Sequence, residues 1–267
     1  MQALRQRGLG VAALGYDSGE LLKEFATRRK ISYPLLSDPD SAVIRRFGLL
    51  NPDYPEGDLA HGVPYPGTFI TDAVGVIRSK FFERAYPERR TAASVLVLAG
   101  TAGESPTTEI RTDHFVLRTS ASNRTAAPGN RVTLVFDLEM GDRKHAYAPG
   151  VSGYRALAVR LDPPPLVKAV HDTVYPEARP YRFEPLQETV PVFEGRFRLL
   201  KDVTLADRKE FVELLRSPEP TLSIAGQLDY QVCSDTVCYP PASLPVSFTF
   251  AIRPPDLERS PEALRHK

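Results

Sequence analysis

The chain has 267 residues, a length that favours two domains over one. Its 34 basic and 33 acidic residues give a net charge of +1, which excludes the strongly basic footprint of a nucleic-acid-binding protein. No apolar run reaches the roughly 18 residues that span a bilayer, so no membrane span is predicted in this chain. The residues after Met1 lack the apolar core of a signal peptide and read as the end of a helix, which suggests a truncated product or an internal start.

Residues 1–100 are predicted to form an α/β domain. The apolar run at 9–15 is typical of a buried parallel strand, and a second short strand is expected at 33–36. Helices are expected to begin at 17–18 and at 38–41, where Asp and Ser can cap them. A hairpin around residues 72–75 and a last helix at 88–98 complete an order of elements typical of the thioredoxin fold.

Three segments of this domain, at 10–17, 33–39 and 66–77, resemble the redoxin (AhpC/TSA, peroxiredoxin) branch of the thioredoxin fold. The resemblance implies that Pro66 occupies the position of a cis-proline beside the active site. The alternative is an ordinary trans X–Pro turn, which base rates alone favour. The resemblance also implies a catalytic cysteine at the start of the helix that precedes Leu9, a point that this sequence does not include, and the sequence has no cysteine before Cys233. We therefore expect an incomplete thioredoxin-like domain without its own peroxidase or reductase activity. Antioxidant peroxidase activity would require a longer product that supplies the missing cysteine.

The second half of the chain is predicted to be an all-β domain. Residues 101–108, rich in Gly, Ser, Pro and Thr, are expected to be a linker. Between 109 and 255, several runs of alternating apolar and polar residues are separated by Pro and Gly, which predicts an immunoglobulin-like β-sandwich. Helix signal is confined to 206–215, and residues 256–267 are expected to be a tail.

Cys233 and Cys238 are the only cysteines of the chain. Four intervening residues easily bring two Cα atoms within the roughly 4.4–6.8 Å that a disulfide requires. A cross-link across so short a loop stabilises a fold little, so local chemistry supports a weak structural staple and a reversible redox pair about equally. Two cysteines without a His pair at ligand spacing do not complete a zinc site, so neither a metal nor another cofactor is predicted.

The segments 144–150, 188–195 and 228–241 resemble the N-terminal periplasmic domain of the thiol:disulfide interchange protein DsbD. The resemblance implies that Cys233 and Cys238 form a redox pair. Such a pair takes electrons from a membrane-embedded donor and passes them to thioredoxin-like proteins in the periplasm. The residues that carry the motif around the pair are the predicted neighbours of the redox site: Tyr230, Gln231, Asp235, Tyr239 and Pro240.

The resemblance favours thiol-disulfide interchange over the alternative, a non-catalytic binding module with a static disulfide. It also implies a mobile aromatic cap over the disulfide, for which Tyr175, Tyr181 and Phe183 are candidates, although a packing role for these residues is equally supported. His145 is expected to be structural, because a lone His in a loop has no partner that would make it a base or a metal ligand.

Overall fold

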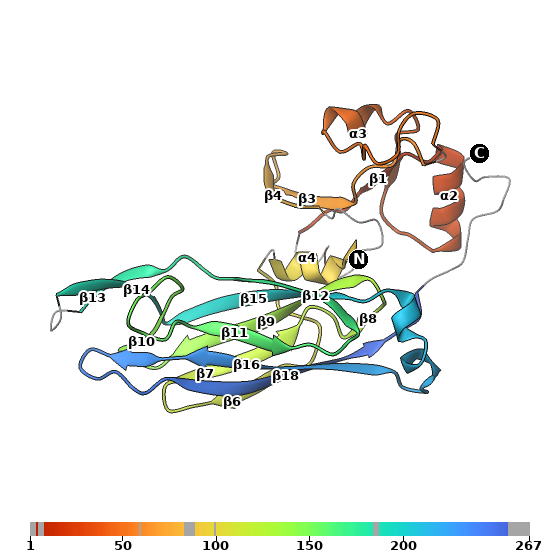
Figure 1. Cartoon of the computed structure of the whole chain (residues 1–267). Coiled ribbons are helices and arrows are strands. Elements are labelled where there is room, and N and C mark those ends of the chain that lie inside the picture. Colours follow the sequence, from red (N-terminus) through yellow and green to blue (C-terminus); the bar gives the residue numbers. More distant parts are fainter. Residues whose placement is uncertain are drawn as a thin grey trace. The chain divides into compact units, whose positions relative to one another are not determined.

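The computed structural model describes residues 4, 8–58, 60–82, 89–98, 100–183 and 187–255. The chain divides into two compact units, one within residues 1–86 and the other spanning Pro87–Pro255. As Figure 1 shows, the first unit contains helices and short strands, whereas the second consists almost entirely of strands. The predicted fold class, α/β followed by all-β, is confirmed.

The first unit contains two pairs of strands and two helices in its described part. The strands β1 and β2 pair in parallel, and β3 and β4 form the predicted antiparallel hairpin. In chain order the elements are β1 (Ala13–Gly15), α2 (Gly19–Arg28), β2 (Leu35–Ser37), α3 (Ala42–Arg46), β3 (Gly67–Thr71) and β4 (Ile77–Phe82).

Polar side chains fix both helix starts, as the sequence predicts. The Ser18 hydroxyl accepts a hydrogen bond from the Leu21 amide at 3.3 Å. The Asp38 carboxylate accepts hydrogen bonds from the amides of Val43 at 3.1 Å and Ile44 at 2.9 Å. These bonds satisfy amides that have no partner within their own helix.

The burial expected for the first strand is wrong. Leu14 of β1 keeps 40% of its surface exposed, and Leu36 of β2 is exposed as well. Parallel strands become buried when other elements cover both faces of their sheet. In the described part of this unit, β1 and β2 pair only with each other.

The prediction of a cis-proline at position 66 is also wrong. All described peptide bonds are trans, including the one before Pro66. The backbone ahead of it is extended, because Leu50 and Pro64 form an antiparallel bridge and the Tyr65 amide donates to the Leu49 carbonyl at 2.8 Å. A trans bond continues this extended segment into β3, and trans is the favoured isomer of an X–Pro bond by about 0.5–1 kcal/mol.

The second unit is a β-sandwich with a small additional sheet. In its described part, the larger sheet has the order β12-β15-β9-β7-β6, with β5 also pairing with β9, and the facing sheet has the order β11-β16-β18-β8. The bounds are β5 (Arg89–Arg90), β6 (Thr108–Arg111), β7 (Phe115–Ala121), β8 (Thr125–Ala126), β9 (Asn130–Met140), β11 (Ala158–Asp162), β12 (Val167–Val174), β15 (Arg196–Leu205), β16 (Thr221–Tyr230) and β18 (Ala242–Ile252).

Alternating apolar residues of the two sheets form the main core. Leu134 and Phe136 of β9 are fully buried, as is Ile224 of β16. The rings of Phe136 and Phe248 meet edge-to-face at 5.2 Å between centroids, which joins the two sheets. In β16 and β18 the period of two in the sequence corresponds to one buried face. In β9 both faces are buried, because Thr133 and Val135 are 0% exposed as well.

A third sheet, with the order β13-β14-β10-β17, carries the first cysteine and was not predicted. Its strands are β10 (Lys144–Tyr147), β13 (Arg179–Phe183), β14 (Glu188–Glu194) and β17 (Val232–Ser234). Figure 1 shows β10, β13 and β14 at one end of the sandwich. The helix signal at 206–215 corresponds to two short 3₁₀ turns, η2 (Arg208–Phe211) and η3 (Leu214–Arg216).

Helix α4 (Ala92–Leu98) belongs to the second unit and not, as predicted from the sequence, to the first domain. The Thr91 hydroxyl caps this helix at the Ser94 amide (3.0 Å) and donates to the Asn123 side chain at 2.7 Å. Just before the helix, Arg90 forms an ion pair with Asp202 of β15 at 2.7 Å. These polar contacts attach the helix to the outer face of the larger sheet.

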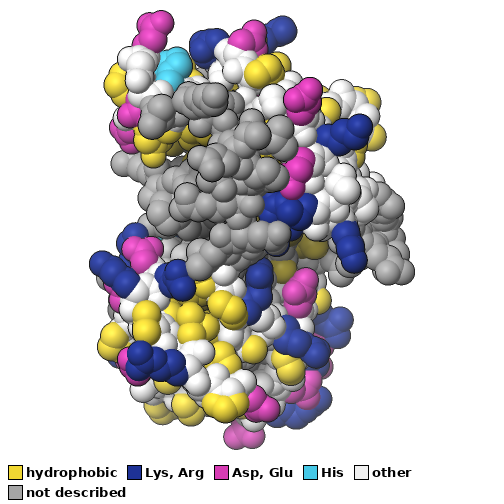
Figure 2. All heavy atoms as spheres, turned by 90° about the vertical axis from the view of Figure 1, so that its right-hand side faces the viewer, with side chains coloured by type: hydrophobic (Ala, Val, Ile, Leu, Met, Phe, Trp, Pro, Cys, Tyr) yellow, Lys and Arg dark blue, Asp and Glu magenta, His cyan; other side chains and the backbone are white. Residues whose placement is uncertain are grey.

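Charges of both signs are interspersed on the surface shown in Figure 2. On the larger sheet, Arg118 pairs with Glu109 at 2.7 Å and with Glu139 at 3.1 Å. Such partly exposed pairs contribute little to stability individually. None of the described helices is long and apolar enough to cross a membrane.

Asp229 of β16 is the buried acid of the second unit closest in sequence to the cysteines. Its side chain is 1% exposed and accepts hydrogen bonds from Arg160 at 2.8 Å and from Ser243. Arg155 adds an ion pair at 3.4 Å. The hydrogen bond from Arg160 is the main reason why the pKa of Asp229 falls from 3.8 to about 2.

We expect Asp229→Asn to lower the free energy of unfolding at neutral pH by about 2 kcal/mol, at roughly 1.4 kcal/mol per pKa unit. Because the folded-state pKa of Asp229 is depressed, its contribution is present above pH 3.8 and is lost as the pH falls towards about 2. Urea unfolding of the wild type and the variant should therefore differ less at about pH 2.5 than at neutral pH. The exposed Asp142→Asn serves as control, and a pH-independent difference would contradict the assignment.

Candidate redox site

Cys233 and Cys238 form a disulfide across the ends of a tight hairpin. Their Cα atoms are 4.0 Å apart and pair as an isolated antiparallel bridge. Next to the pair, the Tyr239 amide donates to the Val232 carbonyl at 2.9 Å. The cysteines thus occupy a non-hydrogen-bonded position of the hairpin, where opposite side chains come closest.

Hydrogen bonds made by Ser234 stabilise the turn between the two cysteines. The Ser234 amide donates to the Val237 carbonyl at 2.7 Å. The Ser234 hydroxyl accepts from the amides of Val237 at 3.1 Å and Thr236 at 3.4 Å. Ser and Asp favour such turns because their short side chains bond to nearby amides. Hydrogen bonds among residues of the loop itself therefore close it.

The two sulfur-bearing residues differ sharply in exposure. Cys233 is 1% exposed and packs with Tyr147, Val190 and Val192 in a small cluster separate from the main core. Cys238 is exposed, as is the neighbouring Val237. Cys238 is therefore the more accessible residue of the pair.

Tyr147 provides the polar contact to the buried sulfur. It ends β10, which pairs antiparallel with β17. Its hydroxyl donates to Cys233 Sγ at 3.0 Å and lies 3.5 Å from Cys238 Sγ. Burial raises the pKa of Tyr147, so the phenol stays protonated at neutral pH and keeps its donor.

Tyr154 contacts Tyr147, and Glu188 contacts Tyr154 in turn. The Tyr154 ring stacks on the Tyr147 ring, with centroids 4.1 Å apart and planes 18° from parallel. The Tyr154 hydroxyl donates to Glu188, the first residue of β14. This hydrogen bond to Glu188 is the main cause of the raised pKa of Tyr154.

His145 lies in an aromatic environment beside the disulfide. It is 2% exposed, and its backbone pairs with that of Cys233. Its ring is 4.2 Å from the Tyr181 ring, and its Nδ1 atom has no hydrogen-bond partner in the described part of the chain. Burial lowers the pKa of His145, which keeps the ring neutral at neutral pH.

Tyr181 is the cap candidate that contacts the loop between the cysteines. Its hydroxyl donates to the Asp235 carboxylate at 3.2 Å, so β13 is connected to the turn. Tyr175 instead donates to the Leu157 carbonyl at 3.1 Å. Phe183 ends β13.

Gln231 connects the hairpin to the loop that carries Tyr154. Its side-chain oxygen accepts from the Arg155 amide at 2.8 Å, and its Nε2 donates to the Tyr239 carbonyl at 3.2 Å. Of the predicted neighbours, Gln231 and Asp235 thus make side-chain contacts around the site.

The remaining predicted neighbours support the surrounding structure. The Tyr230 ring packs edge-on against Phe115 at 4.9 Å and belongs to the main core. The Tyr239 ring lies 4.2 Å from His114, and exposed Pro240 separates it from the start of β18.

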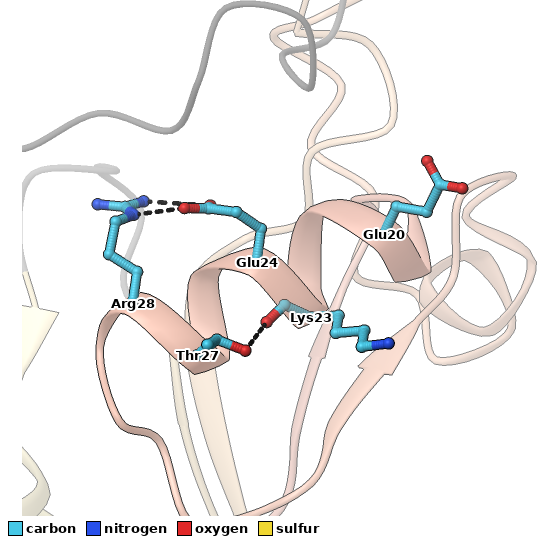
Figure 3. A pocket seen from close by; sticks show the side chains of 5 residues that line it. All are labelled: Glu20, Lys23, Glu24, Thr27 and Arg28. Atoms are coloured by element: carbon cyan, nitrogen blue, oxygen red, sulfur yellow. Dashed lines mark hydrogen bonds and ion pairs between the residues drawn. The ribbon is translucent and has the colours of Figure 1, made fainter.

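A hollow in the first unit is unrelated to this site. The side chains drawn in Figure 3 all come from α2. There, Arg28 pairs with Glu24 at 2.7 Å and the Thr27 hydroxyl donates to the Lys23 carbonyl at 2.8 Å. These polar bonds stay within one helix and include no sulfur.

Comparison with known proteins identifies both parts of the chain. A model described as the N-terminal part of thiol:disulfide interchange protein DsbD matches residues 112–248, just over half of the chain. The chain belongs to this DsbD N-terminal family. A second model, the AhpC/TSA family, matches residues 1–80 and places a redoxin segment before the DsbD N-terminal domain. Both families are related to thiol-disulfide oxidoreductases.

Solved structures include two similar proteins. The N-terminal periplasmic domain of ScsB from Proteus mirabilis is 14% identical with a TM-score of 0.37, and the match covers 52% of this chain and 50% of that one. The reduced DsbD N-terminal domain of Neisseria meningitidis is 15% identical with a TM-score of 0.28, covering 44% and 80%. The chain thus spans half the length of the ScsB structure. No curated protein matches the sequence.

Sequence reasoning did not assign roles to Tyr147, Tyr154 and Glu188. All three lie within or beside the segments that resemble the DsbD N-terminal domain, which was the available signal. The contact of Tyr147 with the disulfide depends on how β10 pairs with β14 and β17, which no local pattern specifies. Tyr154 contacts Tyr147, and Glu188 contacts Tyr154.

In the reduced protein, we expect iodoacetamide to alkylate Cys238 at least about tenfold faster than Cys233, because only Cys238 is exposed and thiol reactivity requires access. Mass spectrometry of the two cysteine-containing peptides over a time course measures both rates. Unfolding in urea should abolish the difference. Equal rates in the folded protein would contradict the asymmetry.

Proposed function

We propose that this protein transfers electrons by thiol-disulfide exchange between the Cys233–Cys238 pair and thioredoxin-like proteins. The observation that carries the proposal is the asymmetric pair itself. Cys238 is an exposed residue, whereas Cys233 is buried and its sulfur accepts a hydrogen bond from the Tyr147 hydroxyl at 3.0 Å. Exchange needs one accessible sulfur and one neighbour that resolves the mixed disulfide.

Reduction of the pair starts at Cys238. A donor thiolate attacks Cys238 Sγ and forms a mixed disulfide, while the bond between the two cysteines breaks and its electron pair remains on Cys233 Sγ. The Tyr147 hydroxyl donates to this thiolate, and hydrogen bonds to charged acceptors are stronger than those to neutral ones. A second donor thiol then releases the donor as its disulfide.

Delivery of electrons runs through the same atoms. The Cys238 thiolate attacks the disulfide of a client and displaces one client thiolate. Cys233 then attacks Cys238 Sγ, which restores the Cys233–Cys238 disulfide and releases the second client thiolate. The client is reduced by two electrons and the pair is oxidised by two.

The proposal also includes a cellular compartment and an electron donor. Stable disulfides belong to oxidising compartments, which supports a periplasmic or other extracytoplasmic location. A membrane protein is the proposed donor, by resemblance to DsbD. The redoxin segment has no cysteine of its own, so we assign no redox step to residues 1–100.

A trapping experiment tests the exchange. We expect reduced Cys233→Ser to form a lasting mixed disulfide with an oxidised thioredoxin-like protein, because its exposed Cys238 attacks and nothing resolves the product. Cys238→Ser should form at least about tenfold less, since its remaining thiol is buried. Non-reducing gels with mass spectrometry of the linked peptides measure both. No complex with Cys233→Ser, together with slow and incomplete reduction of the wild type, would indicate a static disulfide.

The chain should not consume hydrogen peroxide once both cysteines are replaced by Ser, because no thiol remains to be oxidised. A peroxide electrode measures the rate of peroxide consumption with the double variant and with buffer alone. Consumption above the buffer rate would show that the redoxin segment has chemistry independent of cysteine.

A further inference from the structure

Cys238 lies in an exposed segment whose position depends on Tyr239. Cys238 forms an isolated bridge and is not part of a strand, and residues 235–237 before it are exposed as well. Tyr239 is partly buried, and its amide donates to the Val232 carbonyl at 2.9 Å. The contacts of Tyr239 therefore decide where the accessible cysteine lies once the disulfide is open.

Gln231 connects Tyr239 to a different part of the domain. It is partly buried and lies between the end of β16 and the start of β17. Its Nε2 atom donates to the Tyr239 carbonyl at 3.2 Å, and its side-chain oxygen accepts from the Arg155 amide at 2.8 Å. A glutamine side chain carries both a donor and an acceptor, so this one residue bridges two backbone segments. We call these two hydrogen bonds the Gln231 bridge.

The Arg155 end of the Gln231 bridge is attached to the buried acid of β16. The Arg155 guanidinium pairs with Asp229 at 3.4 Å, and the Asp229 side chain is 1% exposed. Arg160 also donates to Asp229, at 2.8 Å. Moving this carboxylate would leave a charge unpaired in the interior, which is costly. The Gln231 bridge therefore attaches the segment after Cys238 to a firmly held part of the sandwich.

We propose that Gln231 is a positioning residue that sets the reduction potential of the Cys233–Cys238 pair. The inference rests on the proposed exchange function. Gln231 acts on the sulfur through Tyr239, the residue covalently linked to Cys238. Its contribution is to hold the reduced segment in the place that it occupies in the disulfide form.

The effect on the redox equilibrium follows from which state needs the bridge. Oxidation joins Cys233 Sγ to Cys238 Sγ and passes two electrons and two protons to the oxidant disulfide, which leaves as two thiols. In the oxidised protein the covalent bond holds the segment whether or not the bridge is present. In the reduced protein, loss of the bridge lets the backbone around Cys238 gain conformational entropy, which disulfide formation must then remove. The bridge therefore favours the disulfide and lowers the reduction potential.

Equilibration with glutathione redox buffers tests the proposal. We expect Gln231→Leu, which removes both hydrogen bonds, to lower the equilibrium constant for disulfide formation by about 3- to 10-fold. This change raises the reduction potential by about 15–30 mV, because a tenfold change in a two-electron couple is about 30 mV. Gln231→Glu keeps the acceptor for the Arg155 amide but loses the donor to Tyr239, so it should change the constant in the same direction. Acid quenching, alkylation and mass spectrometry measure the reduced fraction.

A matched variant and a stability measurement separate positioning from a general loss of structure. Gln227→Leu removes another amide side chain of β16, one that accepts from Arg160 at 3.1 Å, and it should keep the wild-type equilibrium constant. Thermal unfolding of the oxidised proteins measures the structural effect of each substitution. A substitution that destabilises the oxidised and reduced forms equally lowers the unfolding temperature but leaves the equilibrium constant unchanged.

The outcomes distinguish this inference from the exchange function. If Gln231→Leu and Gln231→Glu keep the wild-type equilibrium constant or raise it, or if Gln227→Leu shifts it as much as they do, the positioning role is wrong while the exchange function stands. The buffers are extended with dithiothreitol to reach lower potentials. If the wild-type pair stays oxidised even there, the disulfide is static and the exchange function fails.

Discussion

The antiparallel pairing of β10 with both β14 and β17 is the constraint on which the redox site depends. It brings Cys233 opposite His145 and places Tyr147 two residues further along the same face. Because side chains alternate between faces, a slip of one residue in this register would turn Tyr147 away from the sulfur. The stack of Tyr154 on Tyr147 and the bond to Glu188 rely on the same pairing.

The features that the sequence predicted correctly are local ones. The cap at Ser18, the hairpin of β3 and β4, and the alternation in β18 depend on residues within a few positions of one another. The position of Tyr147 against Cys233 depends instead on partners 86 residues apart, and the third sheet arises from similarly distant pairings. The error at Pro66 has a different origin, because a family position was carried over although the local backbone is extended and paired.

The chain combines a redoxin segment without a thiol and a DsbD N-terminal domain that holds both cysteines. The first segment has its capped helices and its hairpin but leaves Leu14 and Leu36 exposed. The second has a full core and an additional small sheet around the disulfide. Both cysteines thus lie in the part of the chain that is better packed.

The hairpin around the cysteines is also held by hydrogen bonds that do not involve sulfur. The Tyr239 amide remains bonded to Val232, and Gln231 connects the Tyr239 carbonyl to the Arg155 amide. These hydrogen bonds can remain when the disulfide is reduced, so the two thiols stay close together. Attack of Cys233 on a mixed disulfide at Cys238 is then an intramolecular reaction. Well-oriented intramolecular reactions reach effective molarities of about 10⁵ M or more. Under the proposed exchange, a client held by Cys238 would therefore be released quickly, and the complex would exist only briefly during each turnover.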